Sequence, residues 1–219
     1  MTQVAAFFDL DRTLIDVNSA LLYAKYERRQ KRIGLFQLLT TSIYSVLYHL
    51  NILDMEAAYS KALKNYAGIS ESEMERNVRE FFFEEVDSRL QPGARRALDF
   101  HRSQGHQLVL LSTSSSYQAQ AAVESWGLDD AIANRFPSEN GLLTGKISQP
   151  FCYGSGKVVA AEEWLEGRDI ELKHCYFYSD SFSDLPMLLR VGFPKVVNPD
   201  PKLKSYTKRA RWEILDWRR

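Results

Sequence analysis

The chain has few cysteines and no excess of charge of either sign. Two cysteines, Cys152 and Cys175, occur in 219 residues, so a disulfide framework is excluded and both thiols are expected to be free in a reducing compartment. Lysine plus arginine number 28, as do aspartate plus glutamate, which leaves no global field to attract nucleic acid. The first residues lack the basic, apolar and small-residue pattern of a secretory signal. We therefore expect a cytoplasmic globular protein without a nucleic-acid partner.

Charge is spread along the chain except in the segment 33–53, which has no Asp, Glu, Lys or Arg. A basic cluster precedes this segment, and a run of about twenty uncharged residues after such a cluster can indicate a membrane span. Polar residues interrupt the run, however, and its apolar residues recur at helical spacing. The pattern favours an amphipathic helix, leaves open weak contact of that helix with a membrane surface, and argues against a span.

The start of the chain combines an apolar run with two closely spaced carboxylates. Every residue from Val4 to Phe8 is apolar, which predicts a strand that is buried on both faces. Asp9 and Asp11 follow it, and residues two apart in extended chain point the same way. Converging carboxylates repel each other unless a cation or a proton compensates. The spacing therefore suggests a metal site and a nucleophile, although the same residues also suit a capped turn.

Three later segments add polar side chains at the ends of buried strands or at the start of a helix. Ligands of open α/β sheets bind at the carboxyl ends of the strands, and the first amides of a helix favour an anion. The segments are the strand 107–114, which ends in Ser112, Thr113 and Ser114 before a helix at 117–126, the helix start 154–157 with Lys157, and the strand 175–178, which runs into Asp180 and Asp184.

In order and context these four motifs resemble those of the haloacid dehalogenase-like hydrolases, and the resemblance spans residues 4 to about 199. It implies an α/β fold with a Rossmann-like three-layer core and a mostly parallel sheet. It also implies a Mg²⁺-dependent phosphomonoester hydrolase that works through an aspartyl-phosphate. Any one of these motifs would be weak evidence by itself, whereas four of them in this order at strand ends are strong evidence.

The resemblance assigns catalytic roles to the acidic residues. Asp9 would attack phosphorus, and Asp11 would protonate the leaving oxygen and later activate water. Asp9, Asp11 and Asp180 would hold Mg²⁺, with Asp11 contributing its main-chain carbonyl. Asp184 would orient the ligands or a bound water. Asp180 and Asp184 also suit a simple cap of the helix that follows them.

The resemblance also assigns the residues that would hold the phosphate. Ser112 and the Thr113 amide would bind its oxygens, and Lys157 would offset the negative charge. Thr13 would brace the first loop. The neighbouring hydroxyls leave the register open, since Ser112 is also a candidate helix cap.

About ninety residues between the first two motifs read as helices. The first predicted helix runs through about residue 31 and is capped by Asn18 or Ser19. The next are 35–53, 55–67 and 71–85, the last with Ser70 as its N-cap, before a return at Pro92-Gly93 into a helix at 94–104. This insertion resembles the small helical cap of the phosphoserine phosphatase-like branch, a lid that excludes water. We expect a core domain over 1–16 and 90–219 and a cap over 17–89, called the cap segment below.

Two further elements complete the predicted core. A β-hairpin is expected from 134–136 and 142–147, joined through Ser138–Gly141. The last core strand is expected at Lys195–Asn198, stopped by Pro199. None of the four histidines lies in a motif, so each is expected to be structural or exposed.

The substrate and the reaction class stay open at several points. Phosphoserine phosphatases place a glutamate nine residues after the nucleophile, where this chain has Asn18. Phosphoserine is therefore less favoured than another small or amphiphilic phosphate ester. The alternatives are phosphotransfer to an alcohol acceptor and a non-catalytic module that binds phosphoesters or membranes. The oligomeric state is not predicted.

Overall fold

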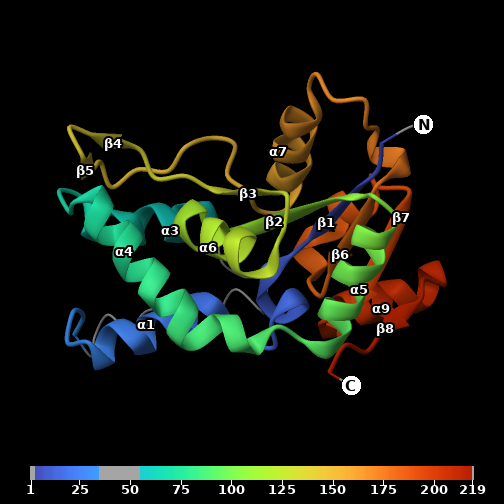
Figure 1. The fold of residues 1–219 in the computed structure, drawn as a ribbon, viewed down its shortest axis with the longest axis horizontal. Coiled ribbons are helices and arrows are strands. Elements are labelled where there is room, and N and C mark those ends of the chain that lie inside the picture. The colour runs from blue at the N-terminus through green and yellow to red at the C-terminus, as the bar shows by residue number, and fades with distance from the viewer. Residues whose placement is uncertain (1–2, 35–54, 219) are drawn as a thin grey trace.

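The computed structural model describes residues 3–34 and 55–218. Its central sheet contains β1 (Ala5–Phe8), β2 (Gln107–Ser115), β3 (Asp130–Asn134), β6 (Tyr176–Ser179), β7 (Phe193–Val197) and β8 (Ile214–Leu215). The strand order is β3-β2-β1-β6-β7-β8 (Figure 1), and neighbouring strands run parallel. This topology confirms the predicted Rossmann-like α/β fold.

Helices cover both faces of the sheet and complete three layers. One face packs against α5 (Pro92–Ser103) and α6 (Ser116–Trp126). The opposite face packs against α7 (Ser155–Leu165), α8 (Leu185–Leu188) and α9 (Pro201–Ala210). The carboxyl ends of the strands stay clear of these layers, so polar residues can gather there.

Strand β1 lies near the middle of the sheet and is fully buried. Successive side chains of a strand point to opposite faces. Ala6 and Phe8 accordingly join the core under α5 and α6, whereas Ala5 and Phe7 join the core under α7 and α8. The unbroken apolar run is therefore explained by burial on both sides, as predicted.

The chain leaves β1 through a tight turn at Leu10–Leu14. Main-chain hydrogen bonds close this turn, from Leu14 to Asp9 (3.3 Å) and from Ile15 to Leu10 (3.1 Å). Arg12 has a φ of 58° within it, a conformation that few non-glycine residues adopt. The turn reverses the chain directly beyond Asp9 and leads into the cap segment.

The described helices of the cap segment are α1 (Ser19–Arg29), α3 (Met55–Leu63) and α4 (Glu71–Phe81), which lie to one side of the sheet (Figure 1). Asn18 caps α1, since its Oδ1 accepts a hydrogen bond from Leu21 N (2.9 Å). The predicted helices at 55–67 and 71–85 are also present, but their α-helical parts end earlier. α3 continues in a tighter 3₁₀ turn at Lys64–Tyr66, whereas α4 continues in a wider π turn at Phe82–Val86 and then a 3₁₀ turn at Asp87–Arg89. The predicted helix 35–53 lies outside the described residues.

The predicted N-cap residue of α4 has the predicted position but does not make the hydrogen bond of a helix cap. Ser70 precedes the helix, but its side chain makes no cap hydrogen bond. Its hydroxyl instead contacts Ser72 Oγ at 2.9 Å.

The predicted hairpin exists, but its strands were placed wrongly. Its strands are the two-residue β4 (Ser138–Glu139) and β5 (Leu142–Leu143), whereas Asn134 ends β3 of the main sheet. Asn140 and Gly141 both have positive φ, which suits the two-residue turn that Asn-Gly favours. The local turn signal was therefore sound, and the strand assignment failed because Asn134 pairs with distant β2.

The hairpin also pairs with the cap segment. Gly68 N donates to Leu143 O and Leu143 N donates to Ile69 O, both at 2.8 Å, and Ser70 forms an antiparallel bridge with Leu142. In Figure 1 the hairpin accordingly extends away from the sheet toward α3 and α4. Strand β5 of the hairpin thus pairs through its main chain with the loop between the cap helices α3 and α4.

The predicted last strand at 195–198 is wrong at its start and is not the last. β7 begins at Phe193, and β8 follows α9 and pairs with the end of β7. Pro199 ends β7 as predicted, and Pro201 stands in the first turn of α9, which Asp200 caps through Leu203 N (2.8 Å). Two residues are too few for β8 to show a periodic pattern.

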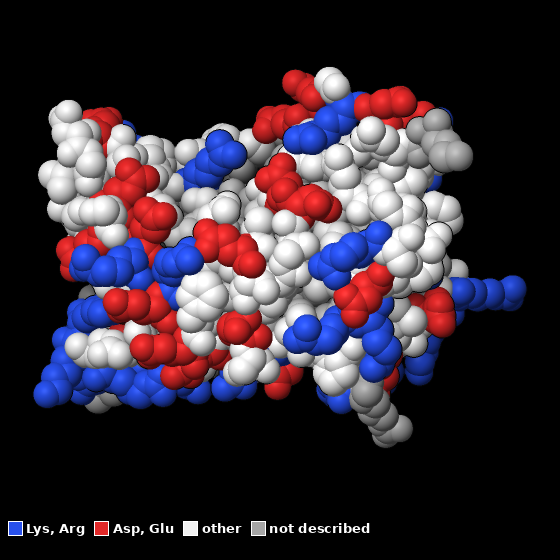
Figure 2. All heavy atoms as spheres, in the orientation of Figure 1, with Lys and Arg blue, Asp and Glu red and all other residues white. Residues whose placement is uncertain are grey.

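Acidic and basic side chains are interspersed on the face shown in Figure 2, and basic ones gather along the edge where α1 lies. Arg29 and Arg32 belong to the basic cluster that precedes the segment 33–53. They pair with Glu85 and Glu80, respectively, so acidic partners neutralise part of that cluster. Among residues 3–34 and 55–218, no helix has both the length and the apolar character that crossing a membrane requires.

His101 of α5 is structural, as expected for a histidine outside the motifs. It is fully buried, its Nε2 lies 2.9 Å from Tyr178 Oη, and its Nδ1 lies 2.8 Å from His106 Nδ1. Burial lowers the pKa of His101 to about 4, and His106 and Lys195 act in the same direction. The imidazole is therefore neutral in the folded protein near neutral pH.

This neutral histidine predicts a loss of stability in acid. Below pH 6.5 the unfolded chain binds a proton at His101 that the folded protein excludes, so the free energy of unfolding falls by roughly 3 kcal/mol as the pH approaches 4. His101→Gln removes that proton, so the stability gap between wild type and variant should shrink from pH 7 to about pH 4.5 in urea unfolding. His174→Gln is the control, and a gap for His101→Gln that stays constant with pH would contradict the prediction.

Candidate active site

Two buried carboxylates meet at the carboxyl edge of the sheet. Asp9 directly follows β1 and Asp180 directly follows β6, and these strands are parallel neighbours. Asp9 N donates to Tyr178 O at 2.9 Å, which continues the pairing past the end of β1. The two side chains are 7% and 6% exposed, respectively. The sheet register therefore places them at one spot although 171 positions separate them in the numbering (180 − 9).

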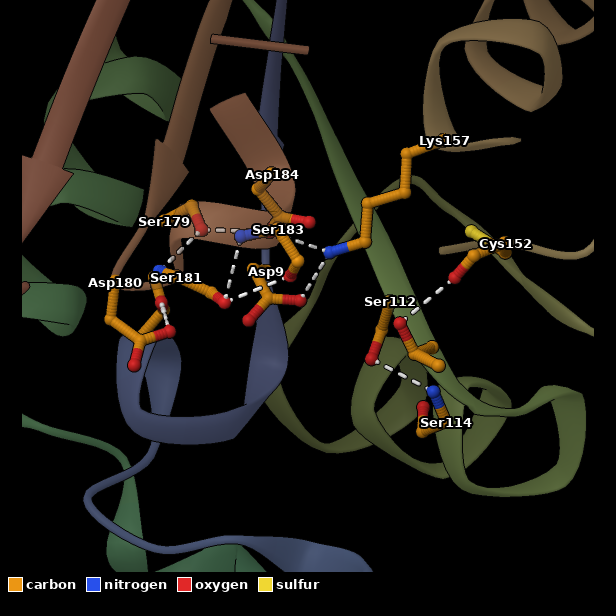
Figure 3. A network of polar contacts seen from close by, with 12 residues as sticks. Asp9, Ser112, Ser114, Cys152, Lys157, Ser179, Asp180, Ser181, Ser183 and Asp184 are labelled. Atoms are coloured by element: carbon orange, nitrogen blue, oxygen red, sulfur yellow. Dashed lines mark hydrogen bonds and ion pairs between the residues drawn. The ribbon is translucent and has the colours of Figure 1, made fainter. Parts of the chain in front are cut away.

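Lys157 brings a buried positive charge between two of the carboxylates (Figure 3). It lies in the first turn of α7 and is 1% exposed. Its Nζ lies 2.7 Å from Asp9 Oδ1 and 2.8 Å from Asp184 Oδ2. Burial alone would lower the pKa of Lys157, but Asp184 and Asp9 outweigh it and hold that pKa well above its ordinary value. The ammonium is therefore charged, and it joins three segments of the core.

Asp184 has a second hydrogen-bond donor that sequence reasoning did not single out. Ser179 Oγ, at the end of β6, donates to Asp184 Oδ2 at 2.7 Å. This hydroxyl and Lys157 fix the buried carboxylate from two sides. A serine directly before Asp180 was visible in the sequence, but the partner five residues later depends on the turn at Phe182–Asp184.

Asp180 lies outside the contacts of Lys157. Thr13 Oγ1 donates to Asp180 Oδ1 at 3.3 Å. The pKa of Asp180 lies well above its ordinary value, because the carboxylate is buried and because Asp9 and Asp184 add negative charge nearby, with Arg12 opposing them. The carboxylates around Lys157 thus carry more negative charge than one ammonium neutralises.

Asp9 and Asp11 differ in their surroundings. Burial raises the pKa of Asp9 to about 7; Lys157 opposes this shift and the charge of Asp184 adds to it. Asp11 turns toward the cap segment, where its Oδ1 accepts a hydrogen bond from Ser19 N at 3.0 Å. Burial also raises the pKa of Asp11, and hydrogen bonds from Ser19 oppose that shift. The first helix of the cap segment thus begins directly on this carboxylate.

The serine-rich segment lies on β2, the other neighbour of β1. The strand continues to Ser115, one residue beyond its predicted end at Ser114. Ser112 is buried, and its Oγ accepts a hydrogen bond from Ser114 N (3.1 Å). Ser115 caps α6 through Gln118 N (3.3 Å). The open question of the helix cap is therefore settled for Ser115 and against Ser112.

Thr113 turns its hydroxyl away from the carboxylates. Its Oγ1 donates to Cys152 O at 2.8 Å, so the hydroxyl contacts the loop that precedes α7. Cys152 and Cys175 are both free and buried, and burial raises the pKa of the Cys152 thiol to about 12. Neither thiol is therefore prepared for nucleophilic chemistry.

Gln91 is a second residue that sequence reasoning missed. It is buried between the cap segment and α5, and its Nε2 donates to Thr13 O (2.7 Å) and Ile15 O (3.3 Å). Its Oε1 accepts a hydrogen bond from Asn198 Nδ2 (3.2 Å). The side chain therefore braces the turn beyond Asp9, and nothing in the local sequence distinguishes it from an ordinary helix-start glutamine.

The residues at this edge fit a hard divalent cation. Within the described ranges, no three acidic, histidine or cysteine side chains form a complete metal cage. Mg²⁺ commonly uses only one or two carboxylates and fills its remaining positions with water and substrate phosphate. Buried oxygen donors with surplus negative charge and no soft ligand match that cation. Asp9 and Asp180, with a main-chain carbonyl, are the residues that could hold it.

Comparisons with known proteins agree with this geometry. The family model of haloacid dehalogenase-like hydrolases matches residues 6–189. A Mycobacterium tuberculosis protein named phosphoserine phosphatase is 30% identical over 220 residues, which cover 98% of this chain and 71% of that protein. A Neisseria meningitidis protein named histidinol-phosphatase is 27% identical over 221 residues, which cover 97% of this chain and 98% of that protein.

Solved structures share the fold. A Bordetella pertussis protein of unknown function superposes with a TM-score of 0.89 at 27% identity, covering 99% of this chain and 100% of that one. A phosphoserine phosphatase with an analogue of the phospho-aspartyl intermediate gives a TM-score of 0.70 at 18% identity, covering 100% and 95%. Together with the sequence matches, these findings make the chain a phosphatase of the haloacid dehalogenase-like hydrolase family, in its phosphoserine phosphatase-like branch.

Proposed function

We propose that this phosphatase is a Mg²⁺-dependent phosphomonoester hydrolase in which Asp9 is the nucleophile. The observation that carries the proposal is the contact of Lys157 with Asp9 and Asp184 at the carboxyl edge of the sheet. A buried ammonium favours the ionised form of a neighbouring carboxylate, and Lys157 here opposes the effect of burial on the pKa of Asp9. The same ammonium is placed where phosphate charge would have to be balanced.

The first half of the reaction transfers the phosphoryl group to the protein. An Asp9 oxygen attacks phosphorus, the bond between phosphorus and the ester oxygen breaks, and an aspartyl-phosphate forms. Asp11 gives its proton to the departing oxygen, for which a raised pKa is suited. Ser112 and the Thr113 amide hold phosphate oxygens, and Lys157 offsets their charge.

The second half releases inorganic phosphate. Asp11, now ionised, takes a proton from a water molecule, whose oxygen attacks phosphorus and displaces Asp9. Asp11 thereby regains its proton and Asp9 its carboxylate, so both return to their starting states. The hydrogen bond from Ser19 N keeps Asp11 oriented through both steps.

The cation of this proposal is Mg²⁺. The carboxylates of Asp9 and Asp180 and the main-chain carbonyl of Asp11 would hold it, and Asp184 would orient that set. When bound, Mg²⁺ neutralises phosphate oxygens and makes phosphorus more electrophilic. The surplus negative charge around Asp180 is the reason for expecting a divalent cation here.

We propose a small or amphiphilic phosphate ester as the substrate. The relatives named for phosphoserine and histidinol phosphate make those two esters the first to examine, although Asn18 stands where the branch has its substrate-binding glutamate. The two free buried thiols suit a cytoplasmic location. The boundaries 1–16, 17–89 and 90–219 remain our proposal for core and cap.

The proposed reaction predicts that Asp9→Asn loses phosphatase activity. An amide of the same shape cannot attack phosphorus, so phosphate release should fall at least about 10³-fold. The panel is para-nitrophenyl phosphate, phosphoserine, histidinol phosphate, phosphocholine and lysophosphatidic acid. Asp99→Asn, an exposed carboxylate on α5 that pairs with Arg102, is the matched control and should retain full activity.

Two outcomes of that assay would overturn the proposal. Wild-type protein that is folded, binds Mg²⁺ and releases no phosphate from any ester would refute hydrolysis. Transfer to added glycerol would then identify a phosphotransferase, and ester binding without turnover would identify a binding module. Full activity in Asp9→Asn would refute the choice of nucleophile.

Metal removal is the second prediction. Protein treated with EDTA should lose phosphate release, and excess Mg²⁺ should restore it. Asp180→Asn weakens a proposed ligand, so the Mg²⁺ concentration for half-maximal activity should rise at least about tenfold. Asp87→Asn lies away from the sheet edge and should leave that concentration unchanged. Persistent turnover in EDTA would contradict the metal requirement.

Lys157→Met is the third prediction, and it concerns stability as well as rate. The variant leaves Asp9 and Asp184 buried without their cation, which should cost about 3 kcal/mol or more in urea unfolding. Adding Asp184→Asn should recover part of that stability but no activity. Lys173→Met removes an exposed ion pair and should change stability by less than about 1 kcal/mol. Equal losses of stability in both lysine variants would contradict a stabilising role for the buried contacts of Lys157.

A further inference from the structure

Asn134, the last residue of β3, joins two segments of the candidate site. It is 1% exposed, and its side-chain amide is used at both ends. Its Nδ2 donates to Thr113 O at 2.7 Å, and its Oδ1 accepts a hydrogen bond from Cys152 N at 2.8 Å. Thr113 Oγ1 adds a third link to Cys152 O at 2.8 Å. Three hydrogen bonds therefore fasten the serine-rich segment to the loop that precedes α7.

The link occurs where the sheet itself provides little restraint. The pairing of β2 with β3 is regular from Val109 to Leu111, shifts between Leu111 and Ser115, and resumes only at Ser115. Thr113 lies inside that interruption, directly after Ser112. The main-chain carbonyl of Thr113 therefore accepts its hydrogen bond from the Asn134 side chain and not from β3. A buried carbonyl requires a donor of this kind.

The loop on the other side of the link is tightly packed against the start of α7. Tyr153 N donates to Phe151 O at 2.7 Å, and Gly156 N donates to Tyr153 O at 2.9 Å. A Cβ at Gly156 would lie 1.9 Å from Phe151 O, so no residue but glycine fits there. Any displacement of Cys152 is thus passed to the first turn of α7, which carries Lys157.

We propose that Asn134 is a positioning residue that sets the separation between the phosphate-holding segment at Ser112–Thr113 and Lys157. The inference rests on the proposed function, because that function supplies the phosphate that would bind between the two segments. Asn134 touches neither substrate nor reacting atoms. Figure 3 shows one of the three hydrogen bonds, the dashed contact between Cys152 and the segment that carries Ser112 and Ser114, beside Lys157.

An asparagine meets this requirement for a chemical reason. One end of its amide donates and the other accepts, and the two groups to be joined are a carbonyl and an N–H. Asn134→Asp keeps the acceptor for Cys152 N but sets an oxygen against Thr113 O. Asn134→Ala removes both bonds. Thr113→Val removes only the hydroxyl link and retains the amide, and Thr113→Ser keeps the hydroxyl.

A control breaks a hydrogen bond between the same two strands at the opposite edge of the sheet. Asp129, directly before β3, accepts a hydrogen bond from Leu108 N at 2.7 Å. Asp129→Ala removes that bond without touching the segments at Thr113 and Cys152. Stability loss that is unrelated to the site therefore affects the control and the Asn134 variants alike.

The experiment measures phosphate binding and local opening in the same proteins. Inorganic phosphate is titrated by calorimetry in the presence of Mg²⁺, and amide hydrogen exchange is followed by mass spectrometry over 108–116 and 150–157. We expect the phosphate dissociation constant to rise about tenfold in both Asn134 variants and in Thr113→Val. Exchange should accelerate in both segments together. Thr113→Ser, which keeps the hydroxyl, should recover part of the affinity that Thr113→Val loses, and Asp129→Ala should bind phosphate like wild type.

The outcomes separate this inference from the proposed function. Faster exchange with unchanged phosphate affinity would overturn positioning and leave Asn134 a structural residue. Faster exchange at 108–116 alone would overturn the link. Wild-type protein that neither binds phosphate nor hydrolyses esters would refute the proposed function, and the positioning role with it, while joint exchange would still establish the link. If Asn134→Ala does not fold, Thr113→Val and Asn134→Asp carry the test.

Discussion

The buried ammonium of Lys157 between two carboxylates is the interaction on which the rest of the candidate site depends. Removing charges from water costs several kcal/mol per ion, and close geometry with additional hydrogen bonds must offset that cost. Here both contacts lie below 2.9 Å, and Ser179 completes the environment of Asp184. Because the three charges come from the end of β1, the start of α7 and the turn after β6, one set of contacts holds the local fold and defines the site.

The surplus of negative charge follows from that arrangement. Lys157 neutralises part of the charge on Asp9 and Asp184, and Asp180 is buried beside them with a threonine hydroxyl as its hydrogen-bond donor. Burial and neighbouring charge raise the pKa of Asp180, so protons compete with any cation for this position. A metal ion bound at such a site would reduce the repulsion between the buried carboxylates, and it would also bind phosphate oxygens.

The sequence predicts the parts of this molecule that depend on local pattern. The apolar run before Asp9, the loop that contains Asn140-Gly141 and the helix start at Asn18 or Ser19 are each encoded within a few residues. The corresponding strand, hairpin and helix start are present, with Asn18 as the cap. The elements that were misplaced depend on partners far away in the chain. β8 exists because β7 offers it an edge, and Asn134 belongs to β3 because β2 pairs with it. The residues of the candidate site were predicted from a resemblance between motifs, whereas supports such as Gln91 carry no local signal.

The pairing of β5 with the loop at 68–71 affects how the fold can vary among relatives. Two of the main-chain hydrogen bonds in this pairing run between Leu143 and the cap loop, and Glu71 N adds another to Gly141 O (2.9 Å). The helices of the cap segment and a hairpin about seventy residues later along the chain therefore form one hydrogen-bonded unit. A graft of the helices alone would leave the donors and acceptors of β5 unmatched. Chimaeras between family members should accordingly exchange both stretches together.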